Sequence, residues 1–430
     1  MKLTVFDKLN EKLYSEQLLN GLPVFVVPKP GFHKKYAFFA TNYGGIDRRF
    51  RLSGKWTDTP AGVAHFLEHK MFDTKDGNAL EQLSANGASP NAYTSTDITA
   101  YHFECIDKFS ENLEILLSFV STPYFTHESV KKEQGIITQE IKMIEDDPGY
   151  CLYYGLLKSL FKGNPVRDSV AGSVASIRKI TADTLYDCHK VFYAPSNMAL
   201  CVVGDIDPLE VIDIATRILP DKPETIPMRD YGEPELFTPE TKSVKKSMDV
   251  SLPLFLAGCK ITPAKNGQEL LWMDIVSALA LEMLCGHSSP LFIRLYAEGQ
   301  INADFSASFD SAADVAYTMF GGETREPGRV FSEVKDEIQR FLSQGPDTAL
   351  FKRIKKAAIG SHIRALNSFS VLASSVVEGH FRGFDPYQAP DILSQITTDD
   401  IMKFIRENLI PENMAISIIN PQNERKKNES

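Results

Sequence analysis

Two histidines and a glutamate with helical spacing are the residues of this chain best suited to chemistry. His65 and His69 lie four positions apart in TPAGVAHFLEHKMFD (59–73), and Glu68 stands between them. The apolar spacing predicts a helix over 60–73, which places both imidazoles one turn apart on one face. Two neutral imidazoles so placed can hold one zinc ion, and Glu68 can act on a water beside it. An H-x-x-E-H pattern arises by chance only about 0.02 times in such a composition.

A catalytic zinc usually has three protein ligands, so a third must come from another segment. The stretch SVKKEQGIITQEIKMIEDD (129–147) has the pattern of a helix. Glu133 and Glu140 lie seven residues apart in it, two turns along one face. From spacing alone, one carboxylate of this helix can be the third ligand, and the choice among its carboxylates stays open.

The spacing of apolar residues in both halves of the chain predicts the helices and strands that position these residues. In the first half we expect strands over 22–30 and 35–45, helices over 60–73 and 77–86, strands over 88–96 and 100–106, helices over 108–191 and a strand over 198–203. In the second half we expect a strand over 254–262, a helix over 267–286, strands over 302–309 and 315–321, helices over 327–407 and a strand over 414–419. Strands beside runs of helices predict an α+β fold with mostly antiparallel sheets packed with helices.

The chain contains an internal duplication. ITADTLYDCHKVFYAPSNMA (180–199) and ITTDDIMKFIRENLIPENMA (396–415) share seven residues without a gap. In each copy a threonine, Thr181 or Thr397, precedes an amphipathic helix and is expected to cap it. A proline then ends the helix, and a buried strand follows. We interpret the two halves as homologous domains.

The segment between the halves has the composition of a linker. PDKPETIPMRDYGEPELFTPE (220–240) contains five prolines with charged residues between them. Such a segment cannot sustain a helix or an interior strand. The predicted organisation is a zinc-binding domain over 1–220, a linker over 221–243 and a homologous domain over 244–430.

Composition and charge exclude several classes of function. The net charge of −10 and the absence of a concentrated basic cluster argue against a nucleic-acid partner. The N-terminus lacks the pattern of a secretory signal, and no stretch approaches the roughly 18 apolar residues of a membrane span. The six cysteines are scattered and include no C-x-x-C pair, which is typical of reduced thiols. We therefore expect a cytoplasmic protein with no membrane partner.

H-x-x-E-H followed about seventy residues later by E-x-x-x-x-x-x-E resembles the signature of the pitrilysin / insulysin / mitochondrial processing peptidase superfamily. GVAHFLEHKMF and KEQGIITQEI are similar to its short bacterial, YmfH-like branch. The resemblance implies that His65, His69 and Glu140 are zinc ligands and that Glu68 is the general base. It also implies that Glu133 supports the site from close by, orienting a ligand.

The same resemblance extends to a candidate substrate strand. GASPNAYTS (87–95) is similar to the edge strand that binds the substrate backbone in the superfamily, with Asn91, Ala92 and Tyr93 at the contact positions. By this analogy a peptide would add to the sheet as a further strand. From the sequence alone, an ordinary hairpin strand is the alternative.

The second half lacks the metal motif. At the repeat offset, Leu281, Leu284 and Cys285 stand where the first half has its H-x-x-E-H residues, which agrees with an inactive domain. The arginine and tyrosine that help to hold substrate in the superfamily have no clear counterpart in LFIRLYAEGQINADF (291–305). The resemblance further implies that one chain is half of a clamshell. Two chains would then pair as a homodimer, or as a heterodimer with a related subunit lacking the zinc motif.

The expected function is that of a zinc metallopeptidase that hydrolyses peptide bonds in short or unfolded peptides, with Glu68 as general base towards a zinc-activated water. Two alternatives stay open. One is a non-catalytic peptide-binding or structural subunit of the same fold. The other is a zinc amidohydrolase that acts on a non-peptide substrate.

Overall fold

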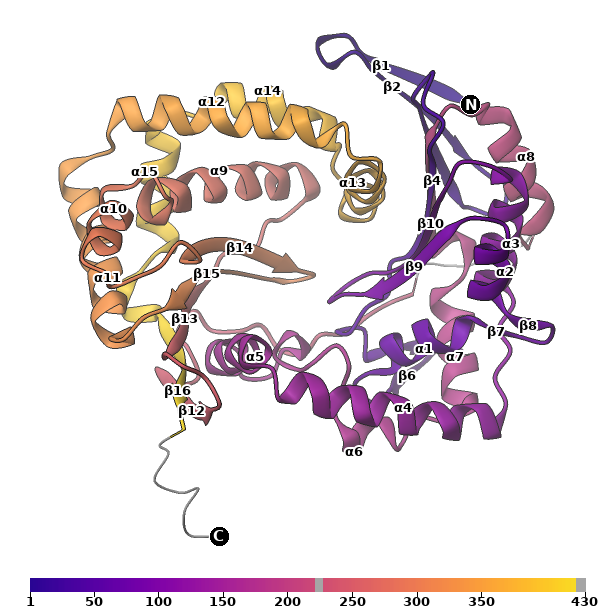
Figure 1. Ribbon diagram of the computed structural model, residues 1–430, viewed down its shortest axis with the longest axis horizontal. Coiled ribbons are helices and arrows are strands. Elements are labelled where there is room, and N and C mark those ends of the chain that lie inside the picture. Colours follow the sequence, from indigo (N-terminus) through magenta and orange to yellow (C-terminus); the bar gives the residue numbers. More distant parts are fainter. Residues whose placement is uncertain (221–226, 423–430) are drawn as a thin grey trace. The chain divides into compact units, whose positions relative to one another are not determined.

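The computed structural model describes residues 1–220 and 227–422, which form two compact units (Figure 1). Unit 1 contains Met1–Ile141, Ser169–Tyr231 and Ile363–Tyr387. Unit 2 contains Lys142–Asp168, Gly232–His362 and the described part of Gln388–Ser430. The linker expected at 221–243 begins with residues that lie outside the described ones, 221–226. The predicted α+β class is confirmed in both units.

Unit 1 is built on a seven-stranded sheet with the strand order β1-β2-β3-β11-β4-β10-β9. Its strands are β1 (Lys2–Phe6), β2 (Glu11–Gln17), β3 (Pro23–Pro28), β4 (Lys35–Thr41), β9 (Ser89–Thr94), β10 (Thr99–Cys105) and β11 (Met198–Gly204), with the small hairpins β5 (Arg49–Leu52) with β6 (Lys55–Asp58) and β7 (Asp73–Thr74) with β8 (Gly77–Asn78). Its helices are α1 (Val63–Met71), α2 (Ala79–Ala85), α3 (Phe109–Ser121), most of α4 (His127–Glu145), α6 (Val174–Ile177), α7 (Ala182–Phe192), α8 (Pro208–Ile218) and α13 (Phe369–Arg382). The sequence did not predict β1 and β2.

Both faces of this sheet are covered by helices. Along β4 the side chains of Tyr36, Phe38 and Ala40 point to one face, where they pack with Leu372 and Val376 of α13. The helices α2, α3 and α8 cover the opposite face (Figure 1). Burial on both faces explains why the central strands have continuous apolar runs instead of alternating polar and apolar residues.

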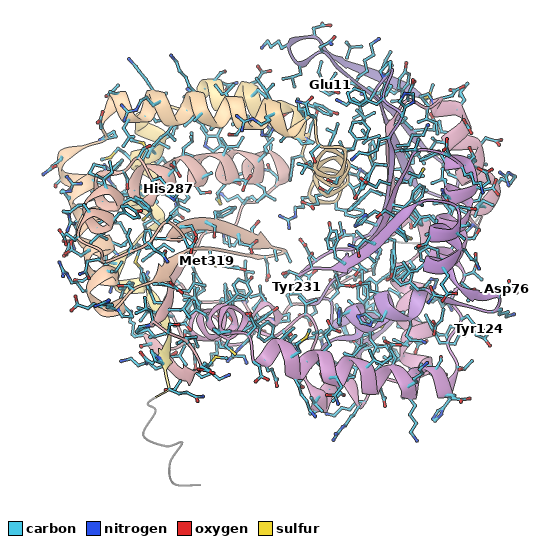
Figure 2. The ribbon with its side chains drawn as sticks, in the orientation of Figure 1. Glu11, Asp76, Tyr124, Tyr231, His287 and Met319 are labelled. Carbon is cyan, nitrogen blue, oxygen red and sulfur yellow. The ribbon has the colours of Figure 1, made fainter. Side chains whose placement is uncertain are left out.

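The helix α13 comes from the second half of the sequence but belongs to unit 1. Lys29, directly after β3, pairs with Glu11 at 2.5 Å and donates to the carbonyl oxygen of Leu366 at 3.2 Å. Figure 2 labels Glu11. This ion pair is largely shielded from solvent. The returning segment is therefore held by a buried polar contact as well as by its apolar face.

Unit 2 is built on a five-stranded sheet with the order β12-β16-β13-β15-β14. Its strands are β12 (Ser243–Met248), β13 (Leu254–Ile261), β14 (Ser306–Ala312), β15 (Val315–Glu323) and β16 (Ala415–Pro421). Its helices are α5 (Pro148–Leu160), α9 (Gly267–Cys285), α10 (Pro290–Ala297), α11 (Pro327–Gln344), most of α12 (Thr348–Ala365), α14 (Ala389–Gln395) and α15 (Thr398–Asn408). The order repeats the sequence β3-β11-β4-β10-β9 of unit 1, with one parallel pair in each sheet.

The predicted duplication is visible in the local structure. Thr181 and Thr397 both accept a hydrogen bond from the third backbone N–H of their helices, as expected of N-caps. Each helix is followed by a short 3-10 turn and then by a central strand, β11 or β16. The helix α5 belongs to the first half of the sequence yet packs on β13 and β16 of unit 2. The two halves have therefore exchanged the helices α5 and α13.

The segment Gly267–Ala297 is long and apolar enough to cross a membrane, so the expectation that no stretch approaches a membrane span is wrong. In its most apolar window, 56% is buried inside the protein. Leu279, Leu281 and Met283 of α9 are among the buried residues. The core helix of a soluble protein can combine the same length and composition with such burial.

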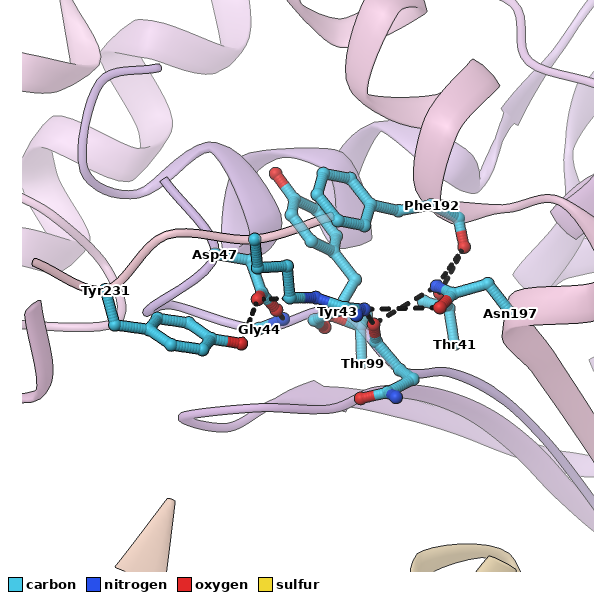
Figure 3. A network of polar contacts seen from close by, with 10 residues as sticks. Thr41, Tyr43, Gly44, Asp47, Thr99, Phe192, Asn197 and Tyr231 are labelled. Carbon is cyan, nitrogen blue, oxygen red and sulfur yellow. Dashed lines mark hydrogen bonds and ion pairs between the residues drawn. The ribbon is translucent and has the colours of Figure 1, made fainter. Parts of the chain in front are cut away.

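A network of buried polar contacts holds the end of the Ser169–Tyr231 segment of unit 1 against Asp47 (Figure 3). Asp47 is 3% exposed and forms an ion pair with Nε of Arg229 at 2.8 Å. Its carboxylate also accepts hydrogen bonds from the hydroxyl of Tyr231 and the backbone N–H of Gly44, both at 2.9 Å. Burial raises the pKa of Asp47 to about 6, although these three partners act in the opposite direction. Arg229 also donates to the side-chain oxygen of Asn197 at 3.2 Å.

Replacing Arg229 with methionine should therefore destabilise the protein strongly. The change leaves Asp47 buried without its cation, which typically costs about 3–5 kcal/mol in the free energy of unfolding. Urea unfolding at neutral pH should show this loss. Arg49→Met is the matched control, because Arg49 pairs with Asp58 and Asp230 while 43% exposed, and such pairs contribute at most about 1 kcal/mol. Equal stabilities of the two variants would contradict the role assigned to Arg229.

Candidate active site

The helix α1 carries the H-x-x-E-H residues and begins later than the sequence predicted. It spans Val63–Met71 instead of 60–73. Gly62 precedes it with a φ of 96°, a conformation that residues with a side chain rarely adopt. A Cβ atom at Gly62 would lie 2.6 Å from the carbonyl oxygen of Ala171. This glycine therefore sets the start of α1 and its close approach to the neighbouring segment.

The two faces of α1 differ in burial. Phe66, Leu67 and Met71 are buried in the core of unit 1. His65, Glu68 and His69 are only partly buried. The 3.6-residue period of the helix thus anchors one face and presents the polar triplet on the other.

The structure brings His65, His69 and Glu140 together. Nε2 of His65 lies 3.4 Å from Oε1 of Glu140, and Nε2 of His69 lies 3.5 Å from Oε2 of the same carboxylate. One donor atom from each of the three residues lies within 4.8 Å of the other two. The histidines come from α1 and the glutamate from α4, so packing of these two helices within unit 1 assembles the group.

The donor set fits a zinc ion. A tetrahedral ion with bonds of about 2.1 Å places neighbouring donors about 3.4 Å apart. The nitrogen–oxygen separations of 3.4 and 3.5 Å, one to each oxygen of the Glu140 carboxylate, are close to this spacing. Two imidazole nitrogens and one carboxylate are also a ligand set found in zinc hydrolases, which leaves a fourth position open.

Glu133 lies on α4 and supports one of the histidines. Its Oε1 lies 3.1 Å from Nδ1 of His69. An ionised carboxylate can only accept, so the proton of a neutral His69 must sit on Nδ1, which leaves the lone pair of Nε2 facing Glu140. Nδ1 of His65 is buried and has no such partner among the described residues. The two histidines are therefore held differently.

The electrostatics of the group favour a bound cation. Burial alone lowers the pKa of His69, but its hydrogen bond with Glu133 and the charges of Glu140 and Glu68 outweigh this effect and raise the pKa. The pKa of Glu140 is lowered, chiefly by its hydrogen bond with His65. Three carboxylates thus surround two imidazoles, and a divalent ion would compensate this excess of negative charge.

Glu68 accepts a hydrogen bond from a residue outside the set predicted from sequence. The hydroxyl of Thr94 donates a hydrogen bond of 2.7 Å to Oε2 of Glu68. Thr94 is the last residue of β9 and belongs to the stretch that resembles a substrate strand. The predicted general base is therefore linked directly to that strand. Knowledge of which strand face meets α1 would have been needed to find Thr94 from sequence.

The strand β9 lies at an outer edge of the seven-stranded sheet and, within the described part of the chain, pairs with β10 alone. Asn91 is exposed, while Ala92 and Tyr93 are partly buried. The ring of Tyr93 packs towards α13, 6.3 Å from that of Phe38. The N–H of Ala92 donates to the side chain of Asn91 at 2.9 Å. The backbone of β9 is thus open to an added strand along the edge away from β10.

The corresponding helix of unit 2 holds no metal donors of this kind. Leu281, Leu284 and Cys285, which stand at the repeat offset, are all buried in α9. Arg294, in the stretch 291–305 where no counterpart of the superfamily's substrate-holding arginine was clear, forms an ion pair with Glu333 at 2.8 Å. Among the described residues, the group on α1 and α4 is the one cluster of metal donors found.

The chain carries an H-x-x-E-H pattern on one helix, with a further glutamate brought to its two histidines from a second helix, in one of two duplicated α+β units. This combination is typical of the inverted H-x-x-E-H class of metallopeptidases. Comparison with known proteins agrees with this class. Residues 53–174 match the family described as Insulinase (Peptidase family M16), and residues 179–358 match the Peptidase M16 inactive domain. The chain belongs to peptidase family M16, and the resemblance noted in the sequence is confirmed.

Individual relatives cover nearly the whole chain. It is 38% identical to the uncharacterized zinc protease YmfH of Bacillus subtilis, over 97% of this chain and 98% of the relative. The chain is 22% identical to a protein of Schizosaccharomyces pombe described as a probable mitochondrial-processing peptidase subunit beta. This match covers 95% of this chain and 91% of the relative. The crystal structure of an M16-like peptidase from Alicyclobacillus acidocaldarius superposes with a TM-score of 0.92 at 32% identity, covering 96% of this chain and 99% of the other.

Proposed function

We propose that the protein is a zinc metallopeptidase that hydrolyses peptide bonds in short or unfolded peptides. The observation that carries this proposal is the convergence of His65, His69 and Glu140 beside Glu68, with the base linked to the open edge strand β9. The relative YmfH is named a zinc protease, which supports the choice of metal and of reaction.

The chemistry follows from the positions of the side chains. Zinc, when held by the three ligands, supplies a Lewis acid that polarises a peptide carbonyl and makes water more acidic. Glu68 accepts a proton from the attacking water while the water oxygen bonds to the carbonyl carbon. As the carbon–nitrogen bond breaks, Glu68 passes this proton to the leaving amine. One carboxylate thus serves as base and then as acid.

The substrate class is inferred from β9. A peptide that pairs with the open edge of this strand would make backbone hydrogen bonds that do not depend on sequence. Only an extended segment can pair in this way, so a folded protein would first have to unfold locally. Asn91, Ala92 and Tyr93 are the proposed contact positions, and the N–H of Ala92 would exchange its bond with Asn91 for one with the peptide.

We further propose that two chains act together in the cytoplasm, either as a homodimer or with a related subunit that lacks the zinc motif. The subunit designation of the Schizosaccharomyces relative supports pairing. The buried Leu281, Leu284 and Cys285 at the corresponding positions of α9 are consistent with a division of labour in which the site in unit 1 performs catalysis.

Metal removal tests the proposal. The purified protein, alone and mixed with a related chain, is incubated with a library of unstructured peptides and with non-peptide amides, and the products are identified by mass spectrometry. We expect peptide cleavage that 1,10-phenanthroline abolishes and added zinc restores, while circular dichroism shows that the metal-free protein stays folded. Intact peptides in every mixture that contains zinc-loaded protein would contradict peptidase activity, and selective cleavage of the non-peptide amides would identify an amidohydrolase.

A further inference from the structure

The hydrogen bond between Thr94 and Glu68 joins two parts of the site that have separate roles. Glu68 belongs to α1 and serves the chemistry, whereas Thr94 belongs to β9 and lies beside the proposed peptide. We propose that Thr94 is a positioning residue for Glu68, which fixes the carboxylate of the base relative to the strand that binds the substrate. This inference rests on the proposed peptidase function and goes beyond it by naming the residue that couples binding to catalysis.

The register of the sheet determines that Thr94 meets the base. Thr94 lies opposite Thr99 of β10, and Ala92 lies opposite Tyr101, whose ring contacts Phe72 at the end of α1. Side chains of a strand alternate between faces, so Thr94 and Ala92 point towards α1. Tyr93, between them, points to the other face and packs in the cluster beneath α13. A slip of one residue would bring the tyrosine to the base instead.

The hydroxyl of Thr94 is held in place by its surroundings. Thr99 is fully buried, donates to the carbonyl oxygen of Tyr43 at 2.9 Å, and lies 3.4 Å from the hydroxyl of Thr94. Threonine is branched at Cβ, so its side chain has few rotamers on a strand. The donor that Glu68 meets therefore has a defined position before any substrate binds.

The hydrogen bond from Thr94 limits the positions that the carboxylate of Glu68 can occupy. A glutamate side chain has three rotatable bonds, and a free carboxylate would occupy many positions. The bond from Thr94 fixes Oε2, while Oε1 makes no hydrogen bond to any residue within 1–220 or 227–422. Oε1 is thus the oxygen available to the water. Thr94 belongs to β9, and the peptide would pair with β9. This one strand would therefore set the distance between Glu68 and the bound peptide bond.

Two substitutions separate this role from general effects on structure. Thr94→Val keeps the size and the branching but removes the hydroxyl, whereas Thr94→Ser keeps the hydroxyl. For a peptide that the wild type cleaves, we expect Thr94→Val to lower kcat about 10- to 100-fold with KM changed less than about twofold, because small misplacement of a catalytic group has effects of this size. Thr94→Ser should retain most of kcat. Thr4→Val, on the opposite edge strand β1, is the matched control and should behave as the wild type.

Two further measurements distinguish a misplaced base from a loss of metal, of stability or of peptide affinity. The zinc content of Thr94→Val and its melting temperature should equal those of the wild type. In a Glu68→Gln background, where turnover is blocked, adding Thr94→Val should leave the Kd of the intact peptide unchanged. If Thr94→Val does not fold, Thr94→Ala replaces it.

The inference is overturned if Thr94→Val keeps wild-type kcat, if Thr94→Ser is impaired equally, or if the loss is one of zinc or of peptide affinity. These outcomes presuppose an active wild type. An inactive, zinc-loaded wild type refutes the proposed function itself, so the two failures can be told apart.

Discussion

Replacing Glu68 with glutamine is expected to abolish measurable peptide hydrolysis while the protein keeps its zinc. Glutamine has the same shape, and its side-chain oxygen can still accept the hydrogen bond from Thr94. The amide cannot accept a proton from water, however. Loss of general base catalysis alone lowers kcat about 10²- to 10⁴-fold. Because Glu68 also returns the proton to the leaving amine, we expect the upper end of this range.

The measurement combines peptidase kinetics with metal analysis on the same preparation. Zinc per chain, determined by inductively coupled plasma mass spectrometry, should match the wild type because Glu68 is not one of the three proposed ligands. Glu81→Gln provides the control, since Glu81 is an exposed carboxylate on α2 and should retain full activity. Activity of Glu68→Gln near that of the wild type would remove Glu68 from the mechanism.

Replacing His69 with alanine should instead remove the metal. The change deletes one of the three proposed ligands and also leaves Glu133 without the imidazole that it contacts. Loss of an orienting partner alone typically weakens metal affinity about 10- to 100-fold, and loss of the ligand itself should exceed this. The purified variant should contain well under one zinc per chain after dialysis, and peptide hydrolysis should be lost with it.

His33→Ala is the control variant, and zinc affinity is the quantity compared. His33 is exposed, and His33→Ala should keep full zinc content and activity. Zinc affinity is measured by competition with a chromophoric chelator. Full zinc occupancy in His69→Ala at the wild-type affinity would show that the ion, if present, binds elsewhere. Together, Glu68→Gln and His69→Ala separate proton transfer from metal binding.

Much of the fold was predictable because local rules determine it. The N-caps Thr181 and Thr397, the helices that they begin and the strands that follow depend on neighbouring residues only. The spacing of His65 and His69 likewise defines a shared helix face without reference to the rest of the chain. The limit of α1 at Val63 was not predicted, because it depends on how closely Gly62 approaches Ala171 in the folded protein.

The parts that the sequence did not predict depend on contacts between distant segments. Spacing left several carboxylates of α4 as possible ligands, and only the packing of α4 against α1 brings Glu140 to the histidines. Thr94 was passed over because its role depends on the register between β9 and β10. The exchange of α5 and α13 could not be predicted from the sequence either. Apolar periodicity shows that a helix face is buried, but it does not show which sheet covers that face.

The exchanged helices have a consequence for biosynthesis. The last strand of the unit 1 sheet, β11, ends at Gly204, but the apolar face that includes Phe38 and Cys201 stays bare until α13 (Phe369–Arg382) has been made. At about 5–20 residues per second, the ribosome needs roughly 9–36 s to cover that interval. The nascent chain therefore carries a large exposed apolar surface for many seconds. A chaperone that shields it, or slow translation that lets unit 2 form first, would decide how much of the protein escapes aggregation.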